Sequence, residues 1–173
     1  MSERYVSPCP QIPPRVKLWT VPPANPHARP MDMQSDMARI AAINARPGQR
    51  YNNDNYDLTN LQAEYNTANS HWNQVYAAMP EPDKTNCYGF LSACYAAFGE
   101  AVELLQTAFG AINGGDAAFQ EGENATDPNK TPKYNTAKTD YNDATNTLQN
   151  EEAKYTTAAG KLAQANLILA NYG

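Results

Sequence analysis

Apolar side chains recur at alternating intervals of three and four residues in three stretches, near 56–79, 85–112 and 133–172. This spacing predicts amphipathic helices, each with an apolar stripe that must be buried against other helices. The sequence therefore predicts an all-α fold, either an antiparallel three-helix bundle or an elongated coiled-coil-like hairpin. The stripes are Leu58, Leu61, Tyr65, Ala68, Trp72, Val75 and Met79; Leu91, Tyr95, Phe98, Val102, Leu105, Phe109 and Ile112; and Tyr134, Ala137, Tyr141, Ala144, Leu148, Glu151, Tyr155, Ala158, Leu162, Ala165, Leu169 and Tyr172.

The third stripe has a large and a small column. Tyrosine and leucine form the large column, whereas alanine fills most of the small one. An alanine column lets a partner helix approach closely, and tyrosines beside it can keep their hydroxyls near water. This pattern predicts tight antiparallel packing inside a bundle.

Glu151 is the one charged residue of the third stripe. It could be a buried acid tuned for proton chemistry. A structural role is favoured instead, in which Glu151 faces solvent at a gap or meets a basic partner that fixes the helix register.

Proline and glycine mark the expected helix boundaries. Pro80-Glu81-Pro82 separates the first two helices, and Asn113-Gly114-Gly115 is expected to end the second. The polar segment 113–132 is then a loop. Because it is long for a connection between helices, it is a candidate contact site or mobile tip.

A short helix is expected near 32–45, before the bundle. Met33, Met37, Ile40 and Ala41 share one face of it, and Arg46-Pro47-Gly48 ends it. A polar joint at 49–55 follows. We therefore divide the chain into an N-terminal arm, residues 1–50, and a helical bundle, residues 51–173.

Residues 1–30 contain eight of the 13 prolines, a density that forbids a helix and predicts an extended, partly polyproline II chain. Apolar residues interrupt the prolines, unlike in a neutral linker. The alternative is a loose tail, but the large aromatic Trp19 favours docking because it needs a place of burial. We predict that the arm binds a partner through Ile12, Arg15, Lys17, Leu18 and Trp19.

Charge is unevenly distributed. The net charge of -5 divides into +3 for residues 1–30 and -8 for the remainder. A basic arm beside an acidic body favours docking onto an acidic surface. We expect protein partners in an assembly, either other proteins or copies of this chain. The arm is too sparsely basic to favour a nucleic acid.

The sequence offers little material for catalysis. His27 and His71 lie near no second histidine or cysteine at metal-binding spacing, and a phosphate-binding glycine loop or nucleophile elbow is missing. Cys87 and Cys94 are about 10 Å apart along a helix, too far for a disulfide, so we expect reduced thiols. We predict a protein that is not an enzyme, with no cofactor, no metal and no small-molecule substrate.

These observations favour a structural or assembly protein, such as a minor capsid, cement or connector subunit of a virion, anchored by its arm. The alternative is a regulatory or secreted binding module that uses a face of the bundle. No apolar run resembles a signal peptide or a membrane span. The expected location is therefore a virion or the cytoplasm.

Overall fold

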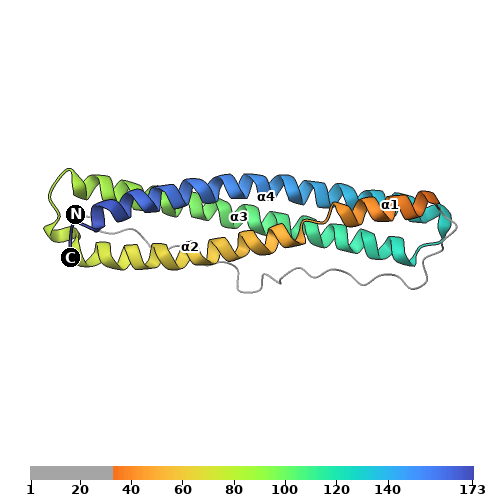
Figure 1. Ribbon diagram of the computed structural model, residues 1–173, viewed down its shortest axis with the longest axis horizontal. Helices are drawn as coiled ribbons and strands as arrows, with labels where there is room; N and C mark the ends of the chain where they lie inside the picture. Colours follow the sequence, from red (N-terminus) through yellow and green to blue (C-terminus); the bar gives the residue numbers. More distant parts are fainter. Residues whose placement is uncertain (1–32) are drawn as a thin grey trace. The chain divides into compact units, whose positions relative to one another are not determined.

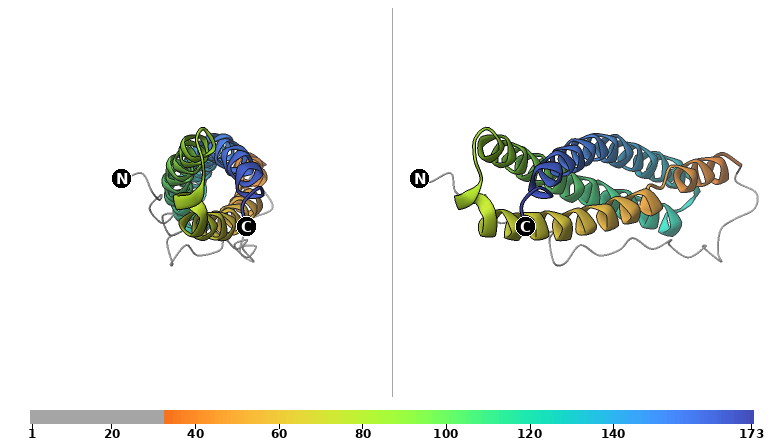
Figure 2. Two further views of the ribbon diagram at one scale, coloured as in Figure 1. Left: turned by 90° about the vertical axis from the view of Figure 1, so that its left-hand side faces the viewer. Right: turned by 60° about the vertical axis from the view of Figure 1, so that its left-hand side comes forward.

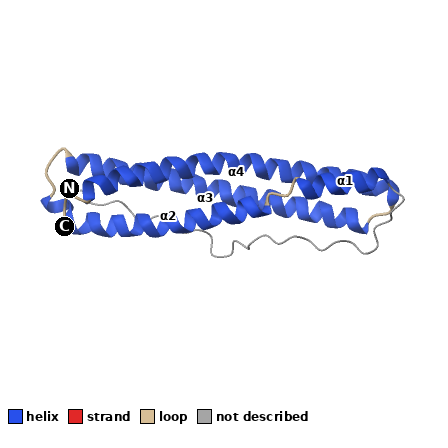
Figure 3. Ribbon diagram, viewed as in Figure 1, coloured by secondary structure: helices blue, strands red, loops and turns tan. Residues whose placement is uncertain are grey.

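The computed structural model describes residues 33–173, of which about 91% are helical. Three helices pack against each other, and the described residues contain no strand (Figure 3). The all-α bundle predicted from the stripes is confirmed. Within the predicted arm 1–50, residues 33–50 are described and mostly helical. The proline-rich residues 1–30, which we call the arm from here on, lie outside the described residues.

Four α-helices follow one another in the described part of the chain (Figure 1). The short helix expected near 32–45 is present, and Pro80-Glu81-Pro82 does separate two long helices. The bounds are α1 Met33–Asn44, α2 Gly48–Val75 with the 3₁₀ turn η2 Tyr76–Ala78, α3 Asp83–Asn124 and α4 Asp127–Leu169.

The loop predicted at 113–132 does not exist. Helix α3 continues through Asn113-Gly114-Gly115 to Asn124, and α4 begins at Asp127, so two residues connect them. The error has a physical cause. Gly115, Phe119 and Gly122 continue the apolar spacing of α3 beyond Ile112, and all three are buried. These glycines occupy core positions of a helix instead of ending it.

The polar joint predicted at 49–55 is also helical, because α2 begins at Gly48. The stripe of α2 extends backward from Leu58 to Asp54 and Tyr51, at the same intervals of four and three residues. Both side chains are buried, with 7% of Asp54 and 0% of Tyr51 exposed. Asp54 is therefore a second acid at a core position, besides Glu151.

The chain divides into two compact units, and α2, α3 and α4 contribute to both. Among the described residues, the first unit contains Asp54–Leu104 and Asn150–Gly173, and the second contains 33–53 and Leu105–Gln149. Helix segments run side by side within each unit (Figure 2). Each unit has its own buried side chains.

The first unit buries most positions of the stripes predicted for its three helix segments. Almost no solvent reaches the side chains of Trp72, Phe98 and Glu151. The interpretation of Glu151 as a solvent-facing residue is wrong, since only 1% of it is exposed. At one end of this unit, His71 Nε2 lies 2.8 Å from the carbonyl oxygen of Tyr172, whose hydroxyl donates to Asp83 at 2.6 Å.

The second unit is built on close contacts between aromatic rings and small residues. One cluster of its core combines alanines of α1, α3 and α4 with one phenylalanine and two tyrosines. This arrangement agrees with the large and small columns predicted for the last helix. The buried residues of this cluster are Ala38, Ala42, Ala118, Phe119, Tyr134, Ala137 and Tyr141.

Candidate docking site

The arm residues predicted to bind a partner, Ile12, Arg15, Lys17, Leu18 and Trp19, lie outside the described residues. The helix that follows them, α1, is described. It belongs to the second unit, and its two sides differ sharply. One side is held against α3 and α4, whereas the other carries apolar side chains into solvent.

Small side chains cover the inward side of α1. Ser35, Ala38 and Ala42 are buried, at intervals of three and four residues. With so little side-chain bulk, the α1 backbone can lie close to the tyrosine rings of α4. Ser35 Oγ is also 3.2 Å from Thr131 Oγ1 of α4.

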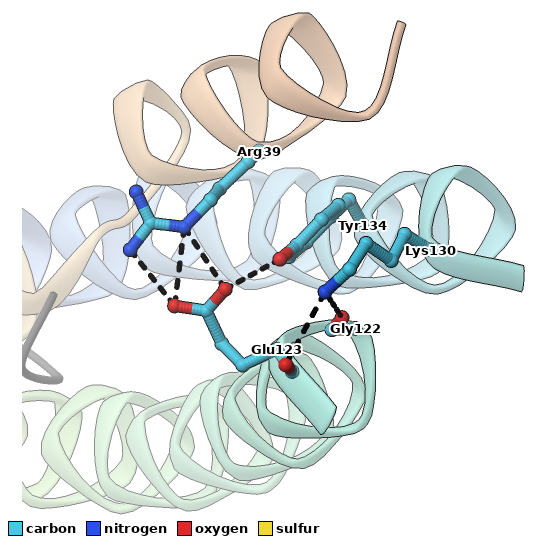
Figure 4. Close-up of polar contacts among 5 residues, drawn as sticks. All are labelled: Arg39, Gly122, Glu123, Lys130 and Tyr134. Atoms are coloured by element: carbon cyan, nitrogen blue, oxygen red, sulfur yellow. Dashed lines mark hydrogen bonds and ion pairs between the residues drawn. The ribbon is translucent and has the colours of Figure 1, made fainter. Parts of the chain in front are cut away.

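A charged clamp attaches α1 to α3 (Figure 4). Arg39 Nη2 and Nε donate to Glu123 Oε1 at 2.8 and 3.1 Å, and Nε lies 3.0 Å from Oε2. The same carboxylate accepts a short hydrogen bond from the hydroxyl of Tyr134 on α4. A fork-shaped guanidinium on a largely buried carboxylate gives a strong, directional contact. One acid thus joins three helices.

Electrostatics favours the ionised form of this clamp. Burial alone would raise the pKa of Glu123, but hydrogen bonds from Arg39 and Tyr134 hold the pKa below its usual value. The hydrogen bond to Glu123 likewise raises the pKa of Arg39. Lys130 Nζ donates to the carbonyl oxygens of Gly122 at 3.0 Å and Glu123 at 3.3 Å, which caps the carboxyl end of α3.

The clamp has a counterpart one heptad away in the antiparallel pair α3 and α4. Tyr141 donates a short hydrogen bond to Asp116, as Tyr134 does to Glu123. Each ring covers the glycine that precedes its acid. A Cβ atom on Gly115 would lie 2.5 Å from the Tyr141 ring, and one on Gly122 would lie 2.7 Å from the Tyr134 ring.

Two arginines stack on the aromatic rings beside this pair of contacts. The guanidinium of Arg39 is 5.4 Å from the centroid of Phe119, and that of Arg46 is 4.3 Å from it. Arg46 also lies 6.0 Å from the ring of Tyr141. Cation–π contacts and hydrogen bonds therefore fix the rotation of α1 about its own axis.

This fixed rotation turns the apolar face of α1 outward. Met33 is 73% exposed, Met37 67% and Ile40 56%, and they are spaced four and three residues apart. The sequence correctly predicts that they share a face, but that face lies away from the core of the second unit. Methionine is flexible and polarisable, and is common at adaptable binding surfaces. We call Met33, Met37 and Ile40 the outer face of α1.

The rest of the described chain offers no comparable site. Within residues 33–173, no group of three or more histidine, cysteine or acidic side chains could hold a metal ion. Burial raises the pKa of the Cys94 thiol to about 12 and that of Cys87 to about 11, which makes both poor nucleophiles. None of the helices described has the length and apolar content needed to cross a bilayer.

Sequence reasoning missed the clamp, although the sequence contains a signal for it. A glycine followed by an acid occurs at 115–116 and again at 122–123, seven residues apart, matching the seven-residue interval between Tyr134 and Tyr141. Arg39 and Arg46 have the same interval. The matched repeats become meaningful only once α3 is recognised as continuous beyond residue 112.

A scan against protein-family models and searches of curated proteins and solved structures found no match for this chain.

Proposed function

We propose that this chain is a non-enzymatic structural or docking protein, a subunit of a large complex that its N-terminal arm holds in place. A minor capsid, cement or connector protein of a virion is the kind of subunit that fits. The observation that carries the proposal is the outer face of α1. It exposes three apolar side chains on the helix that directly follows the arm.

The clamp supports this proposal. An apolar face on a loose helix could turn inward, but Arg39 is held by Glu123 and α1 packs through alanines. Contacts on the other side of the helix therefore offset the free-energy cost of exposing the outer face. Retaining such a face is expected when a partner or an arm covers it.

The second candidate function is a regulatory or secreted binding module that uses the helical face alone. The same exposure of Met37 and Ile40 favours it, since an amphipathic helix can bind a partner without an arm. The two functions differ in whether residues 1–30 are required.

Deleting residues 1–30 tests the requirement. A tagged full-length chain expressed in its native source should sediment with large particles, whereas the arm-deleted chain should remain with small proteins. Trp19→Ala alone should reduce the sedimenting fraction several-fold, because a buried tryptophan is a frequent binding anchor. Circular dichroism and thermal melting should be almost unchanged in both variants, because the bundle has its own core.

The matched control is Leu167→Glu, which alters an exposed apolar residue of α4 that is 74% accessible. It should sediment like the unmodified chain. Full incorporation of the arm-deleted chain would refute the docking role of the arm and move the binding surface to the helices. A full-length chain that never sediments with particles would refute the assembly function itself.

A further inference from the structure

The outer face of α1 lacks a described cover, although its position is rigidly fixed. The side chains of Met33, Met37 and Ile40 are mostly exposed, while the opposite side of the helix is held by Arg39 and Ala38. The chain outside the described residues ends where this face begins, at Met33. We propose that residues 16–21 of the same chain, Val16-Lys17-Leu18-Trp19-Thr20-Val21, dock on the outer face of α1 in the free protein.

The size of the face argues for a tethered occupant. Stable complexes of separate proteins bury about 1,200–2,000 Å² in total, and three side chains supply on the order of a few hundred. A second copy held by this face alone would dissociate. A segment of the same chain needs far less contact, because a short tether gives it an effective concentration in the millimolar range.

The length of the tether fits. Thirteen residues separate Trp19 from Met33. A chain of that length spans about 20 Å when flexible and about 40 Å when fully extended as polyproline II. Helix α1 has 12 residues and is about 18 Å long. Trp19 can therefore reach any position along the outer face.

The chemistry of residues 16–21 also fits. Val16, Leu18, Trp19 and Val21 are apolar, and methionine side chains adapt to an indole ring through favourable sulfur–aromatic contacts. Lys17 can remain in solvent, or face the half-buried Asp36 of α1. The inference rests on the proposed docking role of the arm and adds a regulatory step. In the free protein the arm and the outer face cover each other, and a partner must separate them.

Methionine oxidation in the full-length chain provides the test. Dilute hydrogen peroxide converts exposed methionine to the sulfoxide, and mass spectrometry gives a rate for each site. The double variant Leu18→Ala/Trp19→Ala should oxidise at Met33 and Met37 several-fold faster than the unmodified chain. Met79, which is 3% exposed, provides the internal reference and should oxidise slowly in both.

Tryptophan quenching tests the contact from the other side. The chain has two tryptophans, and Trp72 is fully buried, so acrylamide quenching reports mainly on Trp19. Met37→Glu/Ile40→Glu should raise the quenching constant about two- to threefold, because a charged face cannot hold an indole. The control Leu167→Glu should leave it unchanged.

Equal oxidation rates, or equal quenching constants in all variants, would overturn the inference. Protection that disappears on dilution over about a hundredfold range would also overturn it, since a tethered contact is independent of concentration. Sedimentation keeps the two proposals distinguishable. If arm deletion abolishes particle binding while the oxidation rates stay equal, the arm docks on partners but not on α1.

Discussion

At the scale of single residues, the least expected feature is a pair of acids at core positions. Asp54 and Glu151 lie in the first unit and are 7% and 1% exposed. Burial raises the pKa of Asp54 to about 9, and hydrogen bonds and charge repulsion from Glu152 and Glu151 add to the shift. At neutral pH the folded protein therefore retains a proton on Asp54 and the acids coupled to it, whereas the same groups are ionised in the unfolded chain.

The pH dependence of stability follows from this difference. Between the ordinary aspartate pKa of 3.8 and about 9, the folded state binds a proton that the unfolded state has lost. Folding stability should therefore fall as pH rises through this window. Asp54→Asn, which cannot ionise, should flatten the decline of melting temperature between pH 5 and pH 9. Glu64→Gln, at an exposed acid of the same helix, should preserve most of it.

A decline of the same steepness in Asp54→Asn would show that Asp54 is already ionised in the folded protein. A pH profile recorded by thermal melting in matched buffers would decide the matter. Sequence reasoning recognised Glu151 through its interrupted stripe, but it missed Asp54. The stripe predicted for α2 starts at Leu58, four residues after Asp54.

Two fully buried tyrosines of the second unit differ in the partners of their hydroxyls. Tyr141 donates to Asp116, whereas the hydroxyl of Tyr51 has no hydrogen-bond partner among the described residues. Removing an unsatisfied hydroxyl should help, so Tyr51→Phe should stabilise the protein by up to about 1 kcal/mol. Tyr141→Phe should destabilise it by about 1–3 kcal/mol, because the partly buried carboxylate of Asp116 loses this donor. Urea denaturation of both variants measures the contrast.

A destabilised Tyr51→Phe would mean that water or another group satisfies the hydroxyl in solution. Both variants retain the aromatic ring and therefore its packing. For Tyr51 this packing includes the Phe109 ring, whose centroid is 5.5 Å away. The comparison therefore isolates the hydroxyl groups.

At the scale of helices, the glycines of α3 distinguish a helix that ends from one that packs closely. Gly115→Ala places a Cβ atom 2.5 Å from the Tyr141 ring, which must move in a filled core. We expect a loss of about 1–3 kcal/mol, more than the helix propensity gained. Gly110→Ala, in the same helix with no atom within 4 Å of its Cβ, should gain up to about 1 kcal/mol.

Thermal or chemical denaturation of these two variants provides a direct measurement of the close approach. If Gly115→Ala were as stabilising as Gly110→Ala, the Tyr141 ring would not rest on Gly115. The pair also explains why the predicted loop was wrong. Glycine ends helices when the chain beyond it is solvated, but here the tyrosines of α4 cover the glycine positions.

The orientation of α1 could not be predicted for a related reason. Its sequence offers both a Met-Ile face and an alanine face, and the more apolar face would ordinarily be buried. The tyrosines of α4 and Phe119 leave room only for small residues, and Arg39 finds its acid on α3. Both constraints come from residues about 80 to 100 positions away in the sequence, so the local pattern of α1 contains no information about them.

At the scale of the whole chain, the apolar stripes alone were enough to predict the fold class. Apolar residues spaced alternately three and four apart indicate a helix and the side of it that is buried. The predicted core positions Phe98, Ala144 and Leu162 are accordingly buried. The arm residues with predicted binding roles remain a prediction, because Ile12 to Trp19 lie outside the described residues. The proposed function depends on surface residues, which a core pattern does not specify.

The paired contacts of Gly115 with Tyr141 and of Gly122 with Tyr134 also limit how this chain can change length during evolution. A single residue inserted in α3 between the two glycines would rotate one of them away from its tyrosine by about 100°. An insertion of seven residues in α3 would preserve the alignment only if α4 gained seven as well, because a two-residue turn joins the helices. Relatives of this protein should therefore differ in this region by whole heptads, gained or lost in both helices together.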